Sequence, residues 1–409
     1  MNHIEDRMNI IIDMEKKIFA NLSENINMYF DYCTLTYHLY LYFKQNNIDY
    51  ANNYYNKGRY ILKELLKKIS LKNYFFSNMG TWNGIVGILY IMQSYNLNQD
   101  LDSKIKYLEE YVVNDVTKLL NERKYKLENI DLDIVSGISG VGLYFLNYCY
   151  KEKQELIKKI NYQLIEVLSS YNTIEYQGKY IKNNPKEIDY SISHGVLGII
   201  YYLSKYYSLT KDNSILEEIN KSLEIYKIFM LDKCHNHITK FPSVLRIDIT
   251  GQRYYHYSNR SVWCYGSIGT FRALYLISKI TKNECLKNLV IKEVQKFEKD
   301  RISDFNLICP TFCHGLSGMY LILSLFNNEE LKSQKLKSKI IEIEDKIWIY
   351  YNKKLPYFFP KIDDNGKGNK KIEYDNTSFV SGAVSIGICY ILLKLNDQNN
   401  YFTYSLALK

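Results

Sequence analysis

The chain has 409 residues, of which 46% are hydrophobic and 24% charged. These values are typical of a folded globular protein and exclude a disordered chain. Its 53 basic and 44 acidic residues give a net charge of +9, which is compatible with an acidic peptide or a nucleic-acid partner but demonstrates neither. The length allows one large domain or two to three ordinary ones.

The first residues of the chain and its cysteine content indicate in which cellular compartment the protein is expected. The first residues, Met1-Asn-His-Ile-Glu-Asp, include acids and lack the apolar run of a signal peptide. No stretch reaches the roughly 18 consecutive apolar residues that a membrane span requires. Eight cysteines are too sparse for a disulfide scaffold, so a reducing compartment is expected. We therefore predict a soluble, cytoplasmic protein whose functional cysteines are metal ligands or nucleophiles.

In chain order, the hydrophobic pattern predicts helix after helix, with few strands. Apolar residues step by three and four, with Lys/Glu-rich opposite faces, in segments 101–120, 154–168, 213–231, 284–300 and 329–350. Two pieces are strand-like: Ile174 to Ile181, and the alternation of Leu245, Ile247 and Ile249 with polar residues. They predict small β-containing insertions near 171–190 and 238–262 rather than a separate domain. Segment 363–370 is predicted to be a loop.

A G-x-x-G motif followed by an apolar helical run recurs along the chain. Successive copies begin about 50 to 70 residues apart, which leaves room for the glycine-led helix and one amphipathic partner. Such a repeat predicts a solenoid or closed array of helical hairpins, with the glycine-led helices inside and the Lys/Glu-rich helices outside. The copies are Gly84-Ile-Val-Gly87, Gly137-Ile-Ser-Gly140, Gly195-Val-Leu-Gly198, Gly266-Ser-Ile-Gly269, Gly315-Leu-Ser-Gly318 and the variant Gly382-Ala-Val-Ser385.

The repeat register predicts where reactive side chains meet. If every inner helix begins at the same end of the array, the residues just before each motif gather at one mouth. Helix N-termini there favour thiolates. The position before the first glycine holds Asn83, Ser136, His194, Tyr265, His314 and Ser381, and the position before that holds Cys264 and Cys313 in two copies.

Cys264, Cys313 and His314 therefore predict a zinc site. Two thiolates and one imidazole are three protein ligands, the number that catalytic zinc sites use with one position left open. Cys309 is an alternative fourth ligand, which would make the site closed and structural. A second group with ligand side chains, Cys234-His-Asn-His237 with His256, has no counterpart in the repeat and is better interpreted as surface histidines.

Three motifs together resemble the LanC family of lanthionine synthetase cyclases, over roughly residue 75 to the end of the sequence. They are Ser193-His194-Gly195, Trp263-Cys264-Tyr265-Gly266 and Cys313-His314-Gly315. The resemblance implies an all-α fold, an α/α toroid of seven inner and seven outer helices. One domain would span 1–409, with 1–75 as the seventh hairpin and a small β-containing extension as in the nisin-cyclase type. It also implies one Zn²⁺ per chain on Cys264, Cys313 and His314. Ser385 departs from the glycine pattern of the repeat, and this departure is expected to affect helix packing rather than the chemistry of the site.

The implied activity is (methyl)lanthionine formation in a dehydrated lantibiotic precursor peptide. Zinc would lower the pKa of a substrate thiol, the thiolate would add to dehydroalanine or dehydrobutyrine, and His194 would protonate the resulting enolate. Asp133 is expected to orient His194 or to cap a helix. Arg260 is expected to stabilise enolate charge or to be an ordinary surface arginine. Tyr265 is expected to bind substrate or to pack.

The resemblance also implies partners and leaves other functions open. The partners are the precursor with its leader segment and a dehydratase and ABC transporter assembly, so that peripheral membrane association would arise through partners. No nucleic acid and no direct membrane span are expected. One alternative is a LanC-like, zinc-containing peptide-binding or regulatory protein without cyclase activity. Another is a different α/α-barrel enzyme, a zinc prenyltransferase or a glycosidase, although a glycosidase needs two carboxylates at the mouth.

Overall fold

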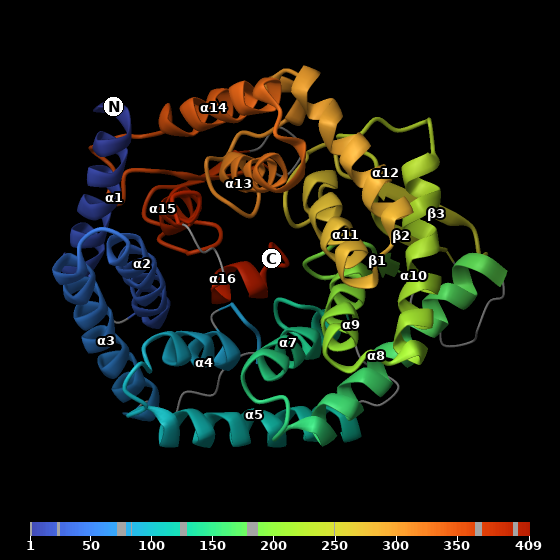
Figure 1. Cartoon of the computed structure of the whole chain (residues 1–409), viewed down its shortest axis with the longest axis horizontal. Helices are drawn as coiled ribbons and strands as arrows, with labels where there is room; N and C mark the ends of the chain where they lie inside the picture. Colours follow the sequence, from blue (N-terminus) through green and yellow to red (C-terminus); the bar gives the residue numbers. More distant parts are fainter. Residues whose placement is uncertain are drawn as a thin grey trace. The chain divides into compact units, whose positions relative to one another are not determined.

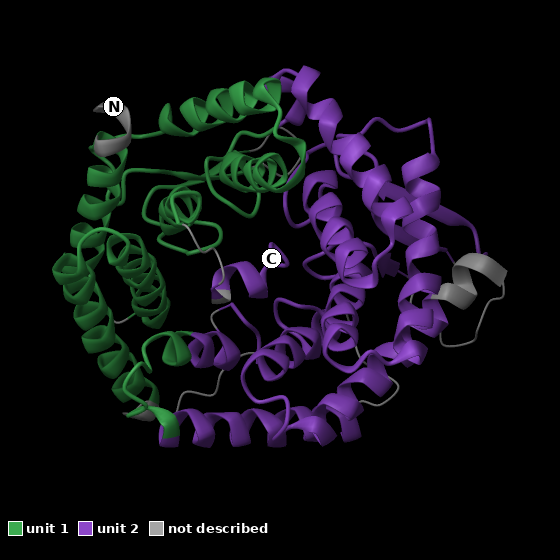
Figure 2. Cartoon of the chain, in the orientation of Figure 1, with its two compact units in different colours: residues 1–75, 91–102, 307–398 green, residues 76–90, 103–306, 399–409 purple. Residues whose placement is uncertain are grey.

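The computed structural model describes residues 2–22, 25–71, 79–82, 84–122, 129–177, 187–248, 250–364, 370–395 and 400–409. These residues are mostly α-helical, with a few short strands (Figure 1). The chain divides into two compact units (Figure 2). Unit 1 comprises residues 1–75, 91–102 and 307–398, and unit 2 comprises residues 76–90, 103–306 and 399–409.

Unit 1 is built from helices and one small hairpin of strands. Within it, α2 packs against α1, α3 and α15, and α13 packs against α14 and α15. Helix α4 (Ile85–Ser94) begins in unit 2 and ends in unit 1. The elements are α1 (Asn2–Ala20), α2 (Ile26–Lys44), α3 (Ile48–Leu71), α13 (Leu316–Phe326), the π-helical turn η3 (Asn327–Leu331), α14 (Gln334–Trp348), β4 (Lys361–Asp364), β5 (Lys370–Glu373) and α15 (Ala383–Leu392).

Unit 2 pairs each glycine-led helix with an amphipathic one. Helix α9 packs between α7 and α11, while α8 contacts α7, α10 contacts α9 and α12 contacts α11. The elements are α5 (Asp102–Glu122), α6 (Asn129–Leu132), α7 (Ile138–Tyr148), α8 (Gln154–Gln177), β1 (Glu187–Asp189), α9 (Val196–Thr210), α10 (Asn213–Leu231), β2 (Pro242–Ile247), β3 (Arg253–Tyr257), α11 (Ser267–Thr281), α12 (Glu284–Gln295), the 3₁₀ helices η1 (Lys296–Lys299) and η2 (Ile302–Phe305), and α16 (Tyr401–Ser405).

The helices predicted to follow the six motifs are all present. Each begins directly after the first glycine of its motif: α4, α7, α9, α11, α13 and α15. In four of the motifs the second glycine lies against a backbone carbonyl six residues earlier, as at Gly269, where a Cβ would overlap the carbonyl of Trp263. The chain before each helix therefore folds back tightly on the helix's first turn. This packing holds the residues at the two positions before the motif beside the helix N-terminus.

Ser385 gives the variant motif a different contact. Its hydroxyl donates to the carbonyl of Gly382 at 2.6 Å and accepts the backbone N–H of Phe312 at 3.0 Å. Phe312 directly precedes Cys313. The serine therefore fixes the backbone next to a candidate metal ligand, which the sequence did not indicate.

The strands differ in part from the expectation. The strand predicted from Leu245 and Ile247 is β2, which pairs with β1 and β3 in an antiparallel sheet. The strand predicted at Ile174 to Ile181 is wrong over 174–177, because α8 continues to Gln177. Buried Ile160, Leu164 and Leu168 set a helical spacing that the short local alternation does not override. Residues 178–186 and Ile249 lie outside the described residues.

The loop predicted at 363–370 is wrong at both ends, because Asp363 and Asp364 belong to β4 and Lys370 belongs to β5. Lys361 of β4 pairs with Glu373 of β5, and Asp363 pairs with Lys371. The sequence did not predict this hairpin because its residues are polar. An exposed two-stranded ribbon needs no alternation of apolar and polar residues. Residues 365–369 lie outside the described residues.

Asp31 of α2 organises the segment that leads into α15. Its carboxylate accepts the hydroxyl of Thr377 and the backbone N–H of Phe379, both at 2.8 Å. The carbonyl of the next residue, Val380, accepts the backbone N–H of Cys313 at 3.0 Å. Burial raises the pKa of Asp31 to about 7, although both hydrogen bonds act in the opposite direction. Asp31 thus supports the backbone on which Cys313 rests.

We expect Asp31 to make the stability of the chain pH-dependent. Because its pKa is about 7 in the folded state and near 3.8 in the unfolded state, the folded state binds more protons between these values. Its favourable contribution is therefore complete below pH 3.8 and is lost as pH rises through 7. Asp31→Asn keeps an acceptor and removes the charge. Relative to wild type, its free energy of unfolding should gain about 2 kcal/mol between pH 5 and pH 8 in urea titrations.

Asp31→Ala is the control for the hydrogen bonds themselves. It leaves the N–H of Phe379 unpaired and should be less stable than Asp31→Asn by about 1–3 kcal/mol at both pH values. A constant stability difference between Asp31→Asn and wild type from pH 5 to pH 8 would contradict the assignment.

Candidate metal centre

The backbone that presents Cys264 is fixed by the tryptophan before it. The indole Nε1 of Trp263 donates to the carbonyl of Leu406 at 3.0 Å, and its ring lies 5.4 Å from the ring of Trp82. Trp263 is 1% exposed and Cys264 is 2% exposed. Trp263 and Trp82 thus act as packing residues, and the Cys264 side chain is held at the start of α11.

Cys313 and His314 lie on the segment that leads into α13. The Cys313 backbone is held by Val380, and its side chain is buried. The His314 side chain is 39% exposed, and its Nδ1 lies 3.8 Å from a carboxylate oxygen of Asp363 in β4. Since Nδ1 faces Asp363, Nε2 is the ring nitrogen left for a metal, and a carboxylate near the other nitrogen is a common feature of metal-binding histidines.

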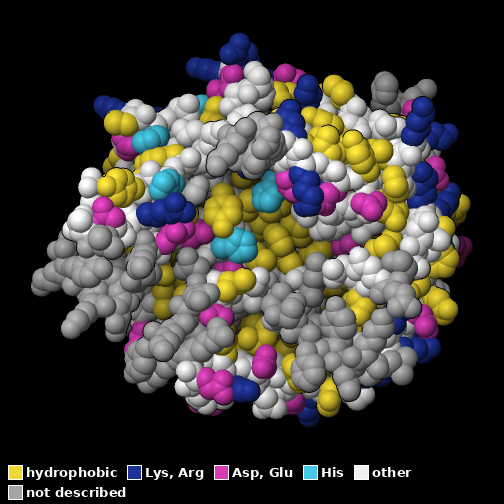
Figure 3. Space-filling view, turned by 180° about the vertical axis from the view of Figure 1, so that it is seen from behind, with side chains coloured by type: hydrophobic (Ala, Val, Ile, Leu, Met, Phe, Trp, Pro, Cys, Tyr) yellow, Lys and Arg dark blue, Asp and Glu magenta, His cyan; other side chains and the backbone are white. Residues whose placement is uncertain are grey.

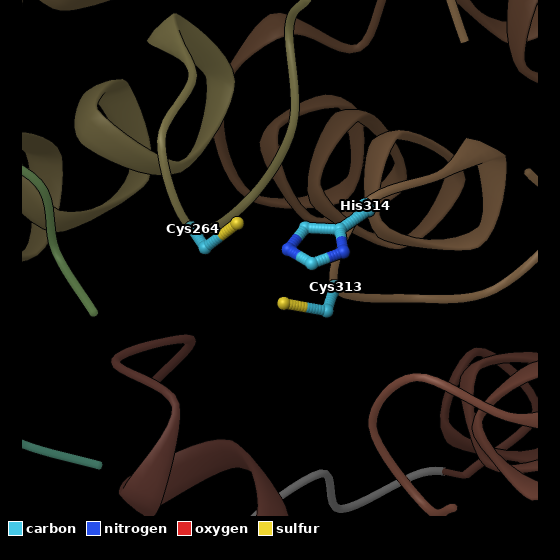
Figure 4. A group of neighbouring side chains, drawn as sticks. All are labelled: Cys264, Cys313 and His314. Carbon is cyan, nitrogen blue, oxygen red and sulfur yellow. The ribbon is translucent and has the colours of Figure 1, made fainter. Parts of the chain in front are cut away.

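The three predicted ligands lie together. The sulfurs of Cys264 and Cys313 and a ring nitrogen of His314 are all within 4.8 Å of one another, and Figure 4 shows the three side chains converging. It is the one group of this kind among the residues that the structure describes. A tetrahedral zinc shell, with Zn–S of about 2.3 Å and Zn–N of about 2.0 Å, places ligand atoms about 3.5–4 Å apart. Two thiolates and an imidazole without a carboxylate fit zinc better than magnesium or calcium.

Cys309 lies outside this group. Its sulfur is 3.1 Å from the hydroxyl of Thr311 and accepts the backbone N–H of Ile362 at 3.3 Å. Burial raises the pKa of the Cys309 thiol, which favours the neutral form. The alternative of a closed four-ligand structural site therefore has no support from the described residues.

The second group with ligand side chains does not converge on a metal site. His235 pairs with Asp232 at 2.9 Å, His237 pairs with Asp300, and His256 is an exposed residue of β3. Among the residues that the structure describes, these histidines form no metal-binding group. The interpretation as surface histidines holds for His256, whereas His237 is 11% exposed and packs against Phe297.

Asp133, which is buried, pairs with the half-buried His194. One oxygen of Asp133 accepts the backbone N–H groups of Val135 at 2.8 Å, Ser136 at 2.5 Å and Gly137 at 3.1 Å. The other oxygen lies 2.6 Å from Nδ1 of His194. Asp133 therefore caps the turn that precedes α7 rather than the helix itself, whose N-cap Gly137 has no side-chain cap. Its contact with Nδ1 is the one expected of a residue that orients His194.

The environment of His194 favours its protonated form. Burial alone would lower the pKa of His194, but the hydrogen bond and charge of Asp133 outweigh it, with help from the charges of Asp189 and Cys264. The net effect raises the pKa of His194. Because Nδ1 faces Asp133, Nε2–H is the proton that the ring can deliver elsewhere.

Tyr265 and Arg260 differ in how they are held. The Tyr265 ring lies 6.0 Å from the His194 ring, and its hydroxyl donates to Asp189. Burial and the nearby Asp189 charge raise the pKa of Tyr265. Arg260 is half-buried on the segment after β3, and its guanidinium makes no hydrogen bond or ion pair with any residue that the structure describes. The described contacts thus join His194, Asp133 and Tyr265, whereas none ties Arg260 to them.

Sequence reasoning missed Asp189 and Asp363. Asp189 precedes His194 by five residues at the end of a short strand, and a carboxylate so close to a motif histidine was a usable signal. Asp363 belongs to the hairpin that was predicted as a loop, so no signal connected it with His314.

The fold and the cysteine–histidine group define the class of protein. The family of lanthionine synthetase C-like proteins matches residues 33–406, and the chain belongs to this family, as the sequence motifs predicted. Among solved structures, the chain is similar to nisin cyclase, with a TM-score of 0.71 and 19% sequence identity over 100% of this chain and 98% of that chain. This likeness confirms the predicted α/α-toroid fold. No curated protein matches the chain. Within the described residues, no helix combines the length and apolar character needed to cross a bilayer.

Proposed function

We propose that this protein is a zinc-dependent lanthionine synthetase. It closes (methyl)lanthionine thioether rings in a dehydrated lantibiotic precursor by adding cysteine thiolates to dehydroalanine or dehydrobutyrine. The observation that carries the proposal is the convergence of Cys264, Cys313 and His314 in a chain of the lanthionine synthetase C-like family. That match includes residues of both units, which supports treating 1–409 as one cyclase domain.

Cys264, Cys313 and His314 would hold one zinc ion per chain. A bound zinc ion would lower the pKa of a substrate thiol, so that a thiolate is available at neutral pH. The two cysteine thiolates would balance the charge of a bound dication and would keep the surroundings of the reacting sulfur electron-rich. Asp363, beside Nδ1 of His314, favours the ring orientation in which Nε2 is the ligand atom.

His194 would deliver the proton that completes the addition. When the substrate sulfur bonds to the β-carbon, the electron pair of the C=C bond moves to the α-carbon and its carbonyl as an enolate. Transfer of the Nε2 proton of His194 to the α-carbon makes the step irreversible and leaves a neutral imidazole. Asp133 holds Nδ1 at 2.6 Å and therefore orients Nε2. Arg260 would offer its charge to the enolate oxygen.

The substrate class implies the partners. Dehydro residues must be formed before ring closure, so a dehydratase has to supply the precursor with its leader segment. We also propose that an ABC transporter exports the product. The chain would be cytoplasmic and would associate peripherally with the membrane through these partners. Figure 3 shows histidine side chains beside exposed hydrophobic and charged ones on one face, a surface character that suits a peptide substrate.

The test is a thiol count on the peptide. Each ring consumes one cysteine thiol without changing the peptide mass. A dehydrated lantibiotic precursor peptide is incubated with zinc-loaded protein, treated with N-ethylmaleimide and analysed by mass spectrometry. We expect wild type to lower the number of maleimide adducts and Cys264→Ala to leave them at the level without protein. Full alkylation of a peptide that nevertheless binds the wild-type protein would favour the alternative, a peptide-binding protein without cyclase activity.

A further inference from the structure

Segment 406–409 of unit 2 is fastened to two helices through its backbone carbonyls. Nε and Nη2 of Arg272 in α11 donate to the carbonyl of Leu408 at 2.9 and 2.6 Å. The hydroxyl of Tyr201 in α9 donates to the carbonyl of Lys409 at 2.7 Å. Arg272 and Tyr201 are both fully buried, with 0% of their surface exposed. The segment is therefore fixed against both α9 and α11.

A third donor ties the same segment to the candidate metal centre. The indole Nε1 of Trp263 donates to the carbonyl of Leu406 at 3.0 Å, and Trp263 directly precedes Cys264 in the chain. Leu406, Ala407 and Leu408 are at most 1% exposed, so water has little access to this part of the backbone. The Leu406 carbonyl can hold the indole in place only as long as the segment itself stays in place.

Arg272 is a costly residue at its position in α11. Phe271, Ala273 and Leu274 beside it are also 0% exposed, and all three are apolar. Burying a guanidinium is unfavourable unless its N–H groups find acceptors. Two nitrogens of Arg272 find theirs on the carbonyl of Leu408. An apolar side chain could be buried here at lower cost, so the guanidinium favours the interpretation that the segment has to be held.

We propose that Arg272 and Tyr201 are positioning residues for the metal centre. They fasten the 406–409 segment, and the segment holds the indole of Trp263. Trp263 in turn fixes the backbone from which Cys264 reaches the metal. The effect of Arg272 and Tyr201 on zinc would thus pass through the segment and the indole. The inference rests on the proposed function in taking zinc as the metal.

Zinc affinity, measured by competition with a chromophoric chelator, tests this link without ring closure. Arg272→Met removes the donors and should weaken zinc binding about 10–100-fold, the usual effect of losing a residue that supports a metal ligand. Arg272→Lys keeps a charged donor and should recover part of this loss. Tyr201→Phe removes a single donor and should weaken zinc binding about 3–10-fold. If Arg272→Met does not fold, Tyr201→Phe decides alone, and wild-type zinc affinity in Tyr201→Phe would then overturn the proposal.

Tyr202→Phe is the matched control for Tyr201→Phe. Tyr202 is the next residue of α9 and is equally buried, but its hydroxyl donates to the side chain of Asn161 at 2.7 Å. In urea titrations Tyr202→Phe should lose about as much stability as Tyr201→Phe, yet it should keep the zinc affinity of wild type. An equal loss of zinc affinity in both variants would show a general effect on the fold and would contradict the positioning role.

Hydrogen exchange of the metal-free proteins follows the link itself. In Arg272→Met and Tyr201→Phe, the backbone amides should exchange faster in residues 402–409 and in a peptide that contains Trp263 and Cys264, but not in α12. Faster exchange confined to residues 402–409 would show that the segment does not act on Trp263, and the proposal would fail.

The two proposals can fail separately. If wild type binds zinc but closes no rings, while the variants weaken zinc binding as expected, the proposed function fails and the positioning role stands. If wild type closes rings and all the variants bind zinc as tightly as wild type, the positioning role fails alone.

Discussion

Replacing Cys264 or Cys313 by alanine is expected to remove zinc and abolish ring closure. Each variant deletes one of two thiolates from a group with three protein ligands, so zinc affinity should fall by more than about 100-fold, beyond what a lost supporting contact costs. Wild type should contain about one zinc per chain, and either variant close to none, by elemental analysis after dialysis.

Cys309→Ala is the matched control for this prediction. Cys309 is a buried cysteine four residues before Cys313, yet it contacts Thr311 and Ile362 instead of the ligand group. Its alanine variant should keep the full zinc content. Zinc loss in Cys309→Ala, or an unchanged zinc content in Cys264→Ala, would show that the ligand set is wrong.

His194→Asn is expected to keep zinc but slow ring closure about 10²–10⁴-fold, the usual range for loss of a general acid. The variant should still bind the dehydrated precursor. Without a proton donor, the addition can reverse before the α-carbon is protonated. Full activity with zinc intact would mean that another group delivers the proton, and zinc loss would mean that His194 is a ligand.

The Asp133–His194 pair predicts the pH dependence of the reaction. Ring closure should require protonated His194 and should fall as pH rises through its pKa, which Asp133, Asp189 and Cys264 raise against the effect of burial. Tyr265 also faces the ring and donates its proton to Asp189. Asp133→Asn removes the strongest favourable charge, so the decline should begin at lower pH in a rate profile. An unshifted profile would contradict this role of Asp133.

The repeat explains why so much of the fold could be predicted. In four motifs the second glycine, such as Gly269, leaves room for a backbone carbonyl, so the motif indicates both the helix start and the tight turn before it. This common geometry indicated that Cys264 would meet Cys313 and His314 at one mouth, although Cys264 lies in a different repeat.

The supporting residues escaped prediction for physical reasons. Asp189 was signalled by its place five residues before His194, but its interaction with Tyr265 of the next repeat is not encoded by any local spacing. Asp363 lies in a hairpin whose polar sequence is indistinguishable from a loop. Ser385 replaces a glycine and could only be interpreted as a packing change until its hydrogen bond to Phe312 was seen.

The number of sulfur ligands around the metal tests the central claim most directly. X-ray absorption at the zinc edge of the wild-type protein without substrate should give two sulfurs at about 2.3 Å, with nitrogen or oxygen atoms at about 2.0–2.1 Å completing the shell. This result would match Cys264, Cys313 and His314 as the protein ligands. A shell with three or four sulfurs would contradict the account, because it would bring Cys309 or another cysteine to the metal and make the site structural.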